Sequence, residues 1–348
     1  MAKQPPNTTV SSLDVAKLAG VSRSAVSRAF TPGASVSLKT REKVLTAAQK
    51  LGYRPNFIAR SLIQRSTKMI GIIMVEFLSP LFSILLRDLT RKLQNLGYQT
   101  LLINIAYDRK IEDALLMVLQ YQVDGIIMIS EVLSWRMAND CAQNNTPVAL
   151  LTHYTLGSHA NIVCCDDVAG GRLAADALLD ADHTRCAYIG GDEGASADRD
   201  RFKGFTERLQ ERGHSLCCHA RGEFTYDSGY AAAKKIFQTG TPPDALFCAS
   251  DLMAIGALDL ARCELGIKVP EELSIIGFDD IPMASWRQYS LTTIRQPTEL
   301  LTDSVITILM NAIETEEPEP MTMLIPGTLV ERATCRPVRG KNEDKLLT

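Results

Sequence analysis

Residues 12–28, SLDVAKLAGVSRSAVSR, predict two short helices joined by a tight turn. Ser11 is positioned to cap the first helix, and Gly20 to end it in the left-handed conformation that glycine adopts at little cost. Ser22 can cap a second helix, which is expected over residues 23–30. Because only about three residues separate the two helices, the segment has the spacing of a helix-turn-helix.

The side chains of this segment divide between packing and an outer face. Small Ala16 lets the two helices approach closely, and Val26 packs the second helix onto the first. The outer face of the second helix carries short hydroxyls and guanidinium groups, from Ser22, Arg23, Ser24, Ser27 and Arg28. These groups suit phosphates and base edges in a DNA major groove. A plain helical hairpin is the alternative, but it has no need of such a face.

The segment belongs to a small basic unit. A third helix is expected between Ser37 and Gly52, so that residues 11–54 form an all-α head after a flexible tail at residues 1–10. The chain has 348 residues and a net charge of −3, but residues 1–66 hold 11 Lys+Arg against 2 Asp+Glu. The head therefore carries a net charge of +9 and the rest of the chain −12. This asymmetry indicates a polyanion partner for the head alone.

Residues 55–67 connect the head to the remainder of the chain. Pro55 breaks the third helix, and residues 57–63 can form one further helix that is too short to be stable alone in water. We expect a partner to order this helix. A plain linker with incidental apolar residues is the alternative.

The head resembles that of the LacI/GalR family of bacterial repressors. The matching segments are residues 12–28, the Val36-Ser37 pair, residues 39–44 and residues 51–56. The resemblance implies double-stranded DNA as a partner, with Arg23 and Ser24 selecting the operator and Arg28 contacting a base. We expect Arg23 and Arg28 to reach guanine edges.

The same resemblance makes residues 55–67 a hinge helix and linker. It implies that two such segments pair in the minor groove, where Leu62 wedges a base step apart and small Ala59 lets the two helices approach. Asn56, near the start of the segment, joins these DNA-binding candidates. Two heads on one operator imply a homodimer that binds a palindrome.

At Met69 the pattern changes to apolar strands that alternate with amphipathic helices. Strands are expected at residues 70–75, 100–105, 125–129, 148–151, 186–190, 245–249 and 274–278. Helices are expected between them, for example at residues 81–96, 111–121, 169–179 and 201–212. Near-continuous apolar strands with intervening helices predict parallel sheets covered on both faces. The expected fold is an all-α helix-turn-helix head followed by an α/β body with two doubly wound parallel-sheet lobes.

This body resembles the periplasmic-binding-protein-like effector domain of the same family over its whole length. The matching residues include Gly170-Gly171 and residues 201–205, 228–230, 250–256, 277–280 and 291–294. The resemblance implies an effector-binding and dimerisation domain at residues 68–340, with an N-lobe at about 68–165 and 296–325 and a C-lobe at about 166–295 and 326–340. The polar tail at residues 341–348 is too short for the leucine-rich helix of tetrameric relatives.

Effector candidates follow from the chemistry that a sugar-like ligand needs. Such a ligand needs a planar donor fork, a carboxylate that accepts from adjacent hydroxyls, and an apolar ring against its C–H face. Arg201 and Asp279 meet the first two needs, follow predicted strands, and match the ligand-binding arginine and aspartate of the family. Phe82, Phe224 and Ser250 also match binding positions. For the two phenylalanines a place in the core is the alternative, and for Arg201 and Asp279 a surface salt bridge.

The sequence departs from the family pattern around this site. Thr152-His153 stands where many relatives have an aspartate-arginine pair, and Ser250 where they usually have asparagine. Arg199 adds a second arginine beside Arg201, and the intervening aspartates can neutralise the arginines at the start of a helix. The alternative is a site tuned to a sugar acid or sugar phosphate. Neutral and anionic sugars stay equal candidates, and a purine-like ligand ranks below both.

Other classes of function find little support. The start of the chain lacks the apolar segment of a secretory signal, which argues against a solute-binding protein of a transporter, and nine cysteines without paired spacing indicate reduced thiols in the cytoplasm. The run Cys217-Cys218-His219 lacks the ligand spacing of a zinc site, so we expect neither metal nor cofactor. We expect a DNA-binding repressor with a small effector, not an enzyme. A corepressor-dependent or activating regulator is the alternative.

Overall fold

The computed structural model divides the chain into two compact units, residues 1–67 and 68–348. It describes residues 10–31, 33–54, 66–75, 79–105, 111–129, 141, 146–152, 154, 160–238, 240–315 and 319–337.

The described residues of the first unit form the helices α1 (Ser12–Ala19), α2 (Arg23–Phe30) and α3 (Leu38–Leu51). The Asp14 carboxylate accepts hydrogen bonds from the Ser11 backbone N–H, at 3.0 Å, and from its hydroxyl, at 2.7 Å, which fixes the start of α1. Gly20 ends α1 with a φ of 66°, a conformation that a side chain would strain. The predicted helix-turn-helix head is therefore confirmed.

The core of the head contains both packing residues expected from the sequence, Ala16 and Val26. Ala16 is 4% exposed and Val26 1%, and they pack with Val15 and with Val44 and Ala47 of α3. At the edge of this core the Phe30 and Tyr53 rings lie 5.9 Å apart. Because α2 buries this face, its opposite face is left to solvent.

The second unit begins with a parallel sheet in the order β11-β5-β4-β3-β1-β2. Its strands are β1 (Met69–Val75), β2 (Gln99–Ile105), β3 (Gly125–Ile129), β4 (Val148–Leu151), β5 (Asn161–Cys165) and β11 (Thr322–Ile325). Among the described residues, the helices that cover it are α5 (Pro80–Asn95), α6 (Ile111–Gln120) and α12 (Thr298–Glu314). Ile72 of β1 packs in one core cluster with α5 and α12, and Ile73 in another with α6, as alternation along a strand requires. We call this part the N-lobe.

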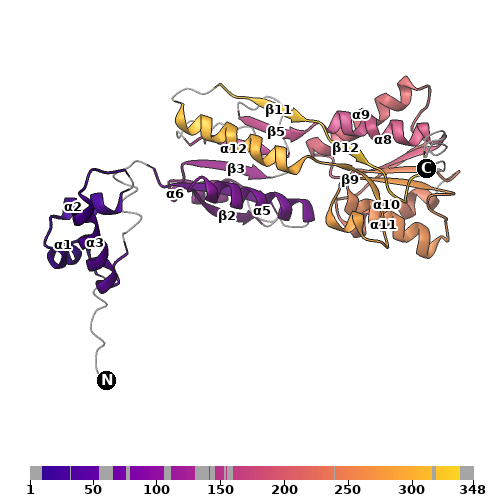
Figure 1. The fold of residues 1–348 in the computed structure, drawn as a ribbon. Coiled ribbons are helices and arrows are strands. Elements are labelled where there is room, and N and C mark those ends of the chain that lie inside the picture. The colour runs from indigo at the N-terminus through magenta and orange to yellow at the C-terminus, as the bar shows by residue number, and fades with distance from the viewer. Residues whose placement is uncertain are drawn as a thin grey trace, which may run out of the picture. The chain divides into compact units, whose positions relative to one another are not determined.

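A second sheet, in the order β12-β10-β9-β8-β6-β7, forms what we call the C-lobe. Its strands are β6 (Cys186–Gly190), β7 (Cys218–Arg221), β8 (Ala245–Cys248), β9 (Ser274–Asp279), β10 (Thr292–Arg295) and β12 (Thr328–Val330). Its helices are α8 (Asp167–Asp180), α9 (Ser196–Glu211), α10 (Tyr226–Gln238) and α11 (Asp251–Asp259), followed by the short η1 (Leu260–Glu264) and η2 (Pro282–Ser285). Figure 1 shows α8 and α9 together on one face of this sheet and α10 and α11 on the other.

The two predicted sheets are confirmed, with corrections at their edges. The sheets are parallel as expected, except that β12 at one edge pairs antiparallel with β10. The helix expected from residue 201 begins at Ser196, so Arg201 lies in its second turn. Strands β5, β7, β10, β11 and β12 have no counterpart among the expected strands. None of the helices in the described part of the chain combines the length and apolar character of a membrane span.

Two pairs of helices approach each other through glycines. A Cβ atom at Gly204 of α9 would lie 2.0 Å from the Val168 carbonyl oxygen of α8, and one at Gly171 would lie 2.3 Å from the Arg201 carbonyl oxygen. Gly229 of α10 and Gly256 of α11 are equally tight against backbone. Backbone cannot yield as a flexible side chain can, so these glycines set how closely the helices lie.

Gly204→Ala is expected to lower the free energy of unfolding by about 1–3 kcal/mol, since α8 and α9 must separate to admit the methyl group. Urea unfolding of the full chain measures this loss. Gly194→Ala is the matched control, because its Cβ would meet nothing closer than 3.5 Å. Equal losses in both variants would show that close helix packing is not the cause.

Candidate DNA-binding surface and effector site

The DNA-binding candidates of the head share one exposed face of α2 and its cap. Ser22, Arg23, Ser24, Ser27 and Arg28 are all exposed, whereas Val26 and Ala29 of the same helix are buried. Ser22 also caps α2, because its hydroxyl accepts a hydrogen bond from the Ala25 N–H at 3.2 Å. The Ser22 and Ser24 hydroxyls lie 2.9 Å apart. The face therefore presents two guanidinium groups and several small hydroxyls on a rigid helix.

The other three DNA-binding candidates, Asn56, Ala59 and Leu62, lie outside the described residues. Their role stays a prediction from the resemblance.

In the C-lobe, Arg201 is a buried cation held among three acceptors. It is 4% exposed, and its Nε donates to Asp167 Oδ1 at 2.8 Å. Its Nη1 donates to the Ala249 carbonyl, and its Nη2 lies 3.8 Å from Asp279 Oδ1. The guanidinium carbon lies 3.6 Å from the centroid of the Phe278 ring, which adds a cation–π contact. The alternative of a surface salt bridge is therefore excluded for Arg201, because its side chain is buried.

Asp279 lies at the carboxyl end of β9, 7% exposed, with a strained φ of 116°. It accepts a hydrogen bond from Gln296 Nε2 at 2.7 Å. Burial raises the pKa of Asp279 to about 6, although Arg201 and Gln296 favour its ionised form. Burial likewise raises the pKa of Asp167 to about 6 against the pull of Arg201. The carboxyl groups of Asp167 and Asp279 therefore share the Arg201 guanidinium in a buried site.

Ser250 and Asp251 form the start of α11 beside this group. The buried Ser250 hydroxyl caps the helix by accepting from the Met253 N–H at 3.4 Å. The fully buried Asp251 carboxylate accepts from the Ile281 N–H at 2.8 Å and from the Thr293 hydroxyl. Burial and the neighbouring Asp279 raise the pKa of Asp251 well above its usual range. Asp251 thereby ties α11 to β10 and to the loop after β9.

The two phenylalanine candidates differ in their surroundings. Phe82 is 7% exposed and packs in the core cluster of α5, near the Ser79 cap and Pro80 that begin this helix. Phe224 is half-buried with a φ of 56°, and its ring lies directly over Gly191, where a Cβ would come within 2.1 Å of it. The ring of Phe224 therefore covers the end of β6.

Tyr154 joins the N-lobe to α9 of the C-lobe. Its backbone N–H donates to the Ser196 hydroxyl at 3.1 Å, and its own hydroxyl donates to Asp200 at 2.6 Å. The Arg199 guanidinium lies 5.2 Å from the Tyr154 ring centroid. Burial and the bond to Asp200 raise the pKa of Tyr154 to about 12. These contacts give the helix that carries Arg201 a direct link to the other lobe.

The aspartates between the arginines do not both act as expected. Asp200 pairs with Arg199 at 3.0 Å, as predicted. The prediction is wrong for Asp198, which pairs with Arg221 of β7 at 2.9 Å. Arg201 pairs instead with Asp167. The sequence interpretation missed Asp167 and Gln296 at this site. The acidic pair Asp166-Asp167 directly after the apolar run at residues 162–165 was the available signal for Asp167.

Comparison with known proteins identifies both units. The protein-family model described as "Bacterial regulatory proteins, lacI family" matches residues 13–56. A second family model, described as "Periplasmic binding protein-like domain", matches residues 175–335. The transcriptional regulator DegA of Bacillus subtilis is 36% identical over 292 residues, which cover 82% of this chain and 86% of DegA. The chain belongs to the lacI family of bacterial regulatory proteins.

Further members of the family agree along most of the chain. The ribose operon repressor of Halalkalibacterium halodurans is 32% identical over 95% of this chain and 98% of its own. A crystal structure of the lac repressor dimer, bound to operator and the anti-inducer ONPF, matches with a TM-score of 0.86 and 27% identity. It covers 94% of this chain and 99% of the repressor. As a lacI-family member the chain is a transcriptional regulator and not an enzyme.

Proposed function

We propose that the chain is a homodimeric repressor that binds a palindromic operator and responds to a small sugar-like effector at Arg201 and Asp279. The observation that carries the effector part is the buried Arg201, held between Asp167 and Asp279 at the carboxyl end of a parallel sheet. Ligands of such folds bind at this end of the strands. The repressors among its relatives support the direction of control. A regulator that needs a corepressor, or that activates, stays the alternative.

The exposed face of α2 supports operator recognition by the head. Arg23 and Arg28 are both exposed, whereas Val26 and Ala29 of the same helix are buried in the core of the head. An arginine reads guanine through two hydrogen bonds to O6 and N7. The proposal adds Asn56, Ala59 and Leu62 as minor-groove contacts of the hinge. In the related lac repressor a dimer is the form bound to operator.

The charges around Arg201 favour a neutral sugar over an anionic one. One guanidinium faces the carboxyls of Asp167 and Asp279, so the ionised group carries a net negative charge. A sugar acid would add a further negative charge to a buried site, which is costly without a new cation. Sugar hydroxyls can instead donate to Asp279 and accept from Arg201. We therefore propose Arg201, Asp279 and Ser250 as polar contacts, with Phe224 and Phe82 as apolar walls.

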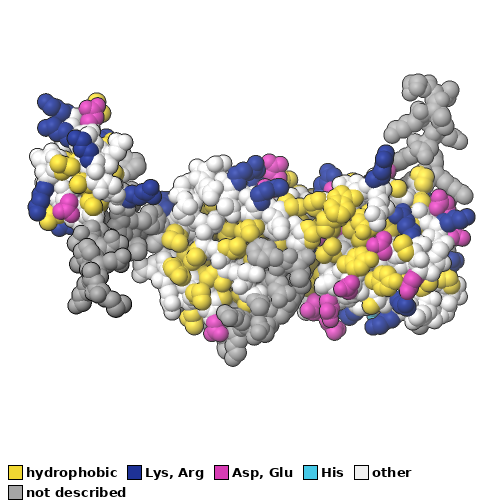
Figure 2. Space-filling model, turned by 90° about the horizontal axis from the view of Figure 1, so that it is seen from below, with side chains coloured by type: hydrophobic (Ala, Val, Ile, Leu, Met, Phe, Trp, Pro, Cys, Tyr) yellow, Lys and Arg dark blue, Asp and Glu magenta, His cyan; other side chains and the backbone are white. Residues whose placement is uncertain are grey.

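An aromatic surface of the C-lobe supports self-association. Trp286 is 55% exposed and stacks on Tyr289 with ring centroids 6.4 Å apart, and Tyr226 and Leu265 are also exposed. Figure 2 views the body from the side of α10 and α11 and shows hydrophobic side chains gathered there. Large exposed aromatic groups mark interaction surfaces on otherwise soluble domains. We propose that this surface contributes to the homodimer.

The link from Tyr154 to α9 supports coupling between effector and DNA. An effector that binds Arg201 contacts α9. The same helix carries Ser196 and Asp200, which accept hydrogen bonds from Tyr154 of the N-lobe. A shift of that helix then changes the relation of the lobes and the attachment of the hinge. Coupling of this kind between two sites is worth typically about 1–3 kcal/mol.

Arg23→Ala is expected to cost about 1–3 kcal/mol of discrimination between the operator and random DNA, because a two-bond contact to guanine is lost. The operator is first selected with the full chain from a random DNA pool, and affinities for selected and random duplexes are then titrated. Lys50→Ala, which removes a charge from the exposed end of α3, is the control and should leave the ratio unchanged. Equal weakening on both DNAs would make Arg23 a phosphate contact only.

A further inference from the structure

A cavity of about 380 Å³ opens in the C-lobe between α9 and β7, the edge strand of the second sheet. It contains none of the proposed effector contacts, since Arg201, Asp279, Ser250, Phe224 and Phe82 are absent from its lining. Asp198 and Phe202 reach it from one face of α9, and Arg199 between them adds to its lining, whereas Arg201 leaves the same helix toward Asp167. The cavity is therefore a separate place on the helix that carries the effector arginine.

The inner walls of this cavity are aromatic. The rings of Tyr188 and Phe202 lie with centroids 5.2 Å apart, and those of Phe202 and His219 lie 5.9 Å apart, all in tilted contacts. Gly190 and Ala220 add little bulk between them. Such walls offer a flat ring the offset and edge-on contacts that aromatic groups prefer.

The other end of the cavity is charged, and its acceptors are already used. Asp198 is 3% exposed, and its Oδ1 accepts from the Tyr188 hydroxyl at 2.7 Å and from the Gly191 N–H at 2.9 Å. Its Oδ2 accepts from Arg221 Nη1 at 2.9 Å. A buried carboxylate with these three donors has little capacity left for a ligand cation. The end of the cavity is consequently suited to an acceptor, not to a donor.

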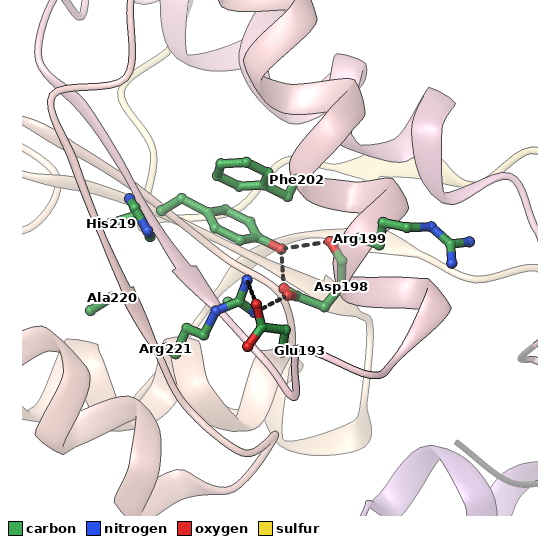
Figure 3. Close-up of a pocket in the computed structure, with 9 residues that line it drawn as sticks. Glu193, Asp198, Arg199, Phe202, His219, Ala220 and Arg221 are labelled. Atoms are coloured by element: carbon green, nitrogen blue, oxygen red, sulfur yellow. Dashed lines mark hydrogen bonds and ion pairs between the residues drawn. The ribbon is translucent and has the colours of Figure 1, made fainter. Parts of the chain in front are cut away.

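Arg221 is the group that can receive this acceptor. Its side chain is 48% exposed, and an arginine has five N–H donors, of which Asp198 takes one here. Glu193 lies 3.8 Å from Arg221 Nη2, beyond hydrogen-bond distance, and its side chain is 84% exposed. An exposed pair of this kind contributes little stability and is readily displaced. Figure 3 shows Arg221 and Glu193 meeting at this end, with Arg199 directed away from it.

We infer that this cavity is a second ligand site, specific for a small aromatic carboxylate. Its ring lies against Phe202 and His219, and its carboxylate binds Arg221 in place of Glu193. Carboxylate and guanidinium match as a two-bond, charge-assisted pair, which sets this class apart from neutral aromatic compounds. The volume is near the lower end for ligand pockets, so one or two rings fit. The inference concerns binding in the C-lobe alone and does not depend on the proposed effector.

The test is a calorimetric titration of the full chain with benzoate, 4-hydroxybenzoate and indole-3-acetate. At least one is expected to bind, and its amide counterpart to bind at least tenfold more weakly. Arg221→Gln is expected to weaken the carboxylate at least tenfold, and His219→Trp to block the cavity. Lys203→Gln removes the same charge from an exposed position of α9 and should leave the affinity unchanged. Thermal unfolding checks that each variant is folded.

Glu193→Gln is expected to change the carboxylate affinity in the opposite direction to Arg221→Gln. It removes the charge that competes for Arg221 from a side chain so exposed that the fold is unaffected, and it should tighten carboxylate binding about twofold to fivefold. Absence of binding by all three carboxylates at millimolar concentration would overturn the inference. Equal binding of carboxylates and amides would overturn it too, as would an affinity that neither Glu193→Gln nor Arg221→Gln changes.

Discussion

Arg201→Met is expected to abolish the response of operator affinity to effector and to lower the free energy of unfolding by about 3–5 kcal/mol near neutral pH. Methionine fills similar space without a charge. It leaves Asp167 and Asp279 buried side by side with no cation between them, which is the costly way to break a buried ion pair. It also removes the donor to the Ala249 carbonyl at the end of β8.

Two measurements separate the parts of this expectation. Urea unfolding gives the stability, and operator titration with and without neutral sugars gives the response. Arg199→Met is the matched control, because its side chain is 43% exposed and pairs with Asp200 near solvent. We expect that variant to lose about 1 kcal/mol or less. An Arg201→Met protein that keeps a full effector response would remove Arg201 from the site.

The head could be predicted from sequence because its signals are local. Ser22, Gly20 and Ser37 cap or end helices within a few residues of themselves, and the structure has all three in those roles. The packing of Ala16 against α2 likewise depends on a turn of about three residues. In the head, the helix boundaries that local capping residues predict are those of the folded structure, so these boundaries could be predicted without knowledge of long-range contacts.

The body was predictable in outline but not at its site. Long apolar runs such as Ile126–Ile129 within β3 are strong signals, whereas β7 and β12 are three or four residues long and half-exposed. The start of α9 gave no capping signal, because its N-cap is Ala195. Arg201 and Asp279 came from the resemblance, but the partner Asp167 lies 34 positions away. Such a pairing depends on how α8 packs on α9, which no local pattern contains.

The charge pattern of Asp198 illustrates the same limit. In sequence it stands beside Arg199, and neutralising that neighbour is the simplest interpretation. In the fold it turns to Arg221, 23 positions away, and to Tyr188. Asp198, Arg221 and Tyr188 all line the cavity beside β7, so its aromatic walls and its arginine could not be assembled from the sequence.

The last prediction concerns pH and follows from Asp167 and Asp279. Burial raises the pKa of both carboxyls from 3.8 to about 6, so the folded chain keeps protons that the unfolded chain releases between about pH 4 and pH 6. The stability that these two carboxyls contribute is therefore greatest below this window and falls as pH rises through it. At 1.36 kcal/mol for each pKa unit, the loss is roughly 2–3 kcal/mol for each group. Asp251, whose pKa burial also raises, adds to the same trend.

Effector affinity should change in the opposite direction, because the ionised Asp279 carboxylate accepts hydrogen bonds from sugar hydroxyls more strongly than the protonated carboxyl does. Asp279→Asn is expected to remove about half of the stability loss between pH 4 and pH 6, and with it most of the sugar affinity at pH 7. Gln296→Leu deletes a hydrogen bond that favours the ionised carboxylate, so it should move the window to higher pH. Urea unfolding and sugar titration at several pH values follow both quantities. If Asp279→Asn retains the wild-type slope, other carboxyls set the pH dependence and Asp279 is ionised throughout. An Asp279→Asn protein that loses about half of the stability slope and the pH dependence of sugar affinity would instead assign that share of the folding cost, and the gain in binding, to one buried charge.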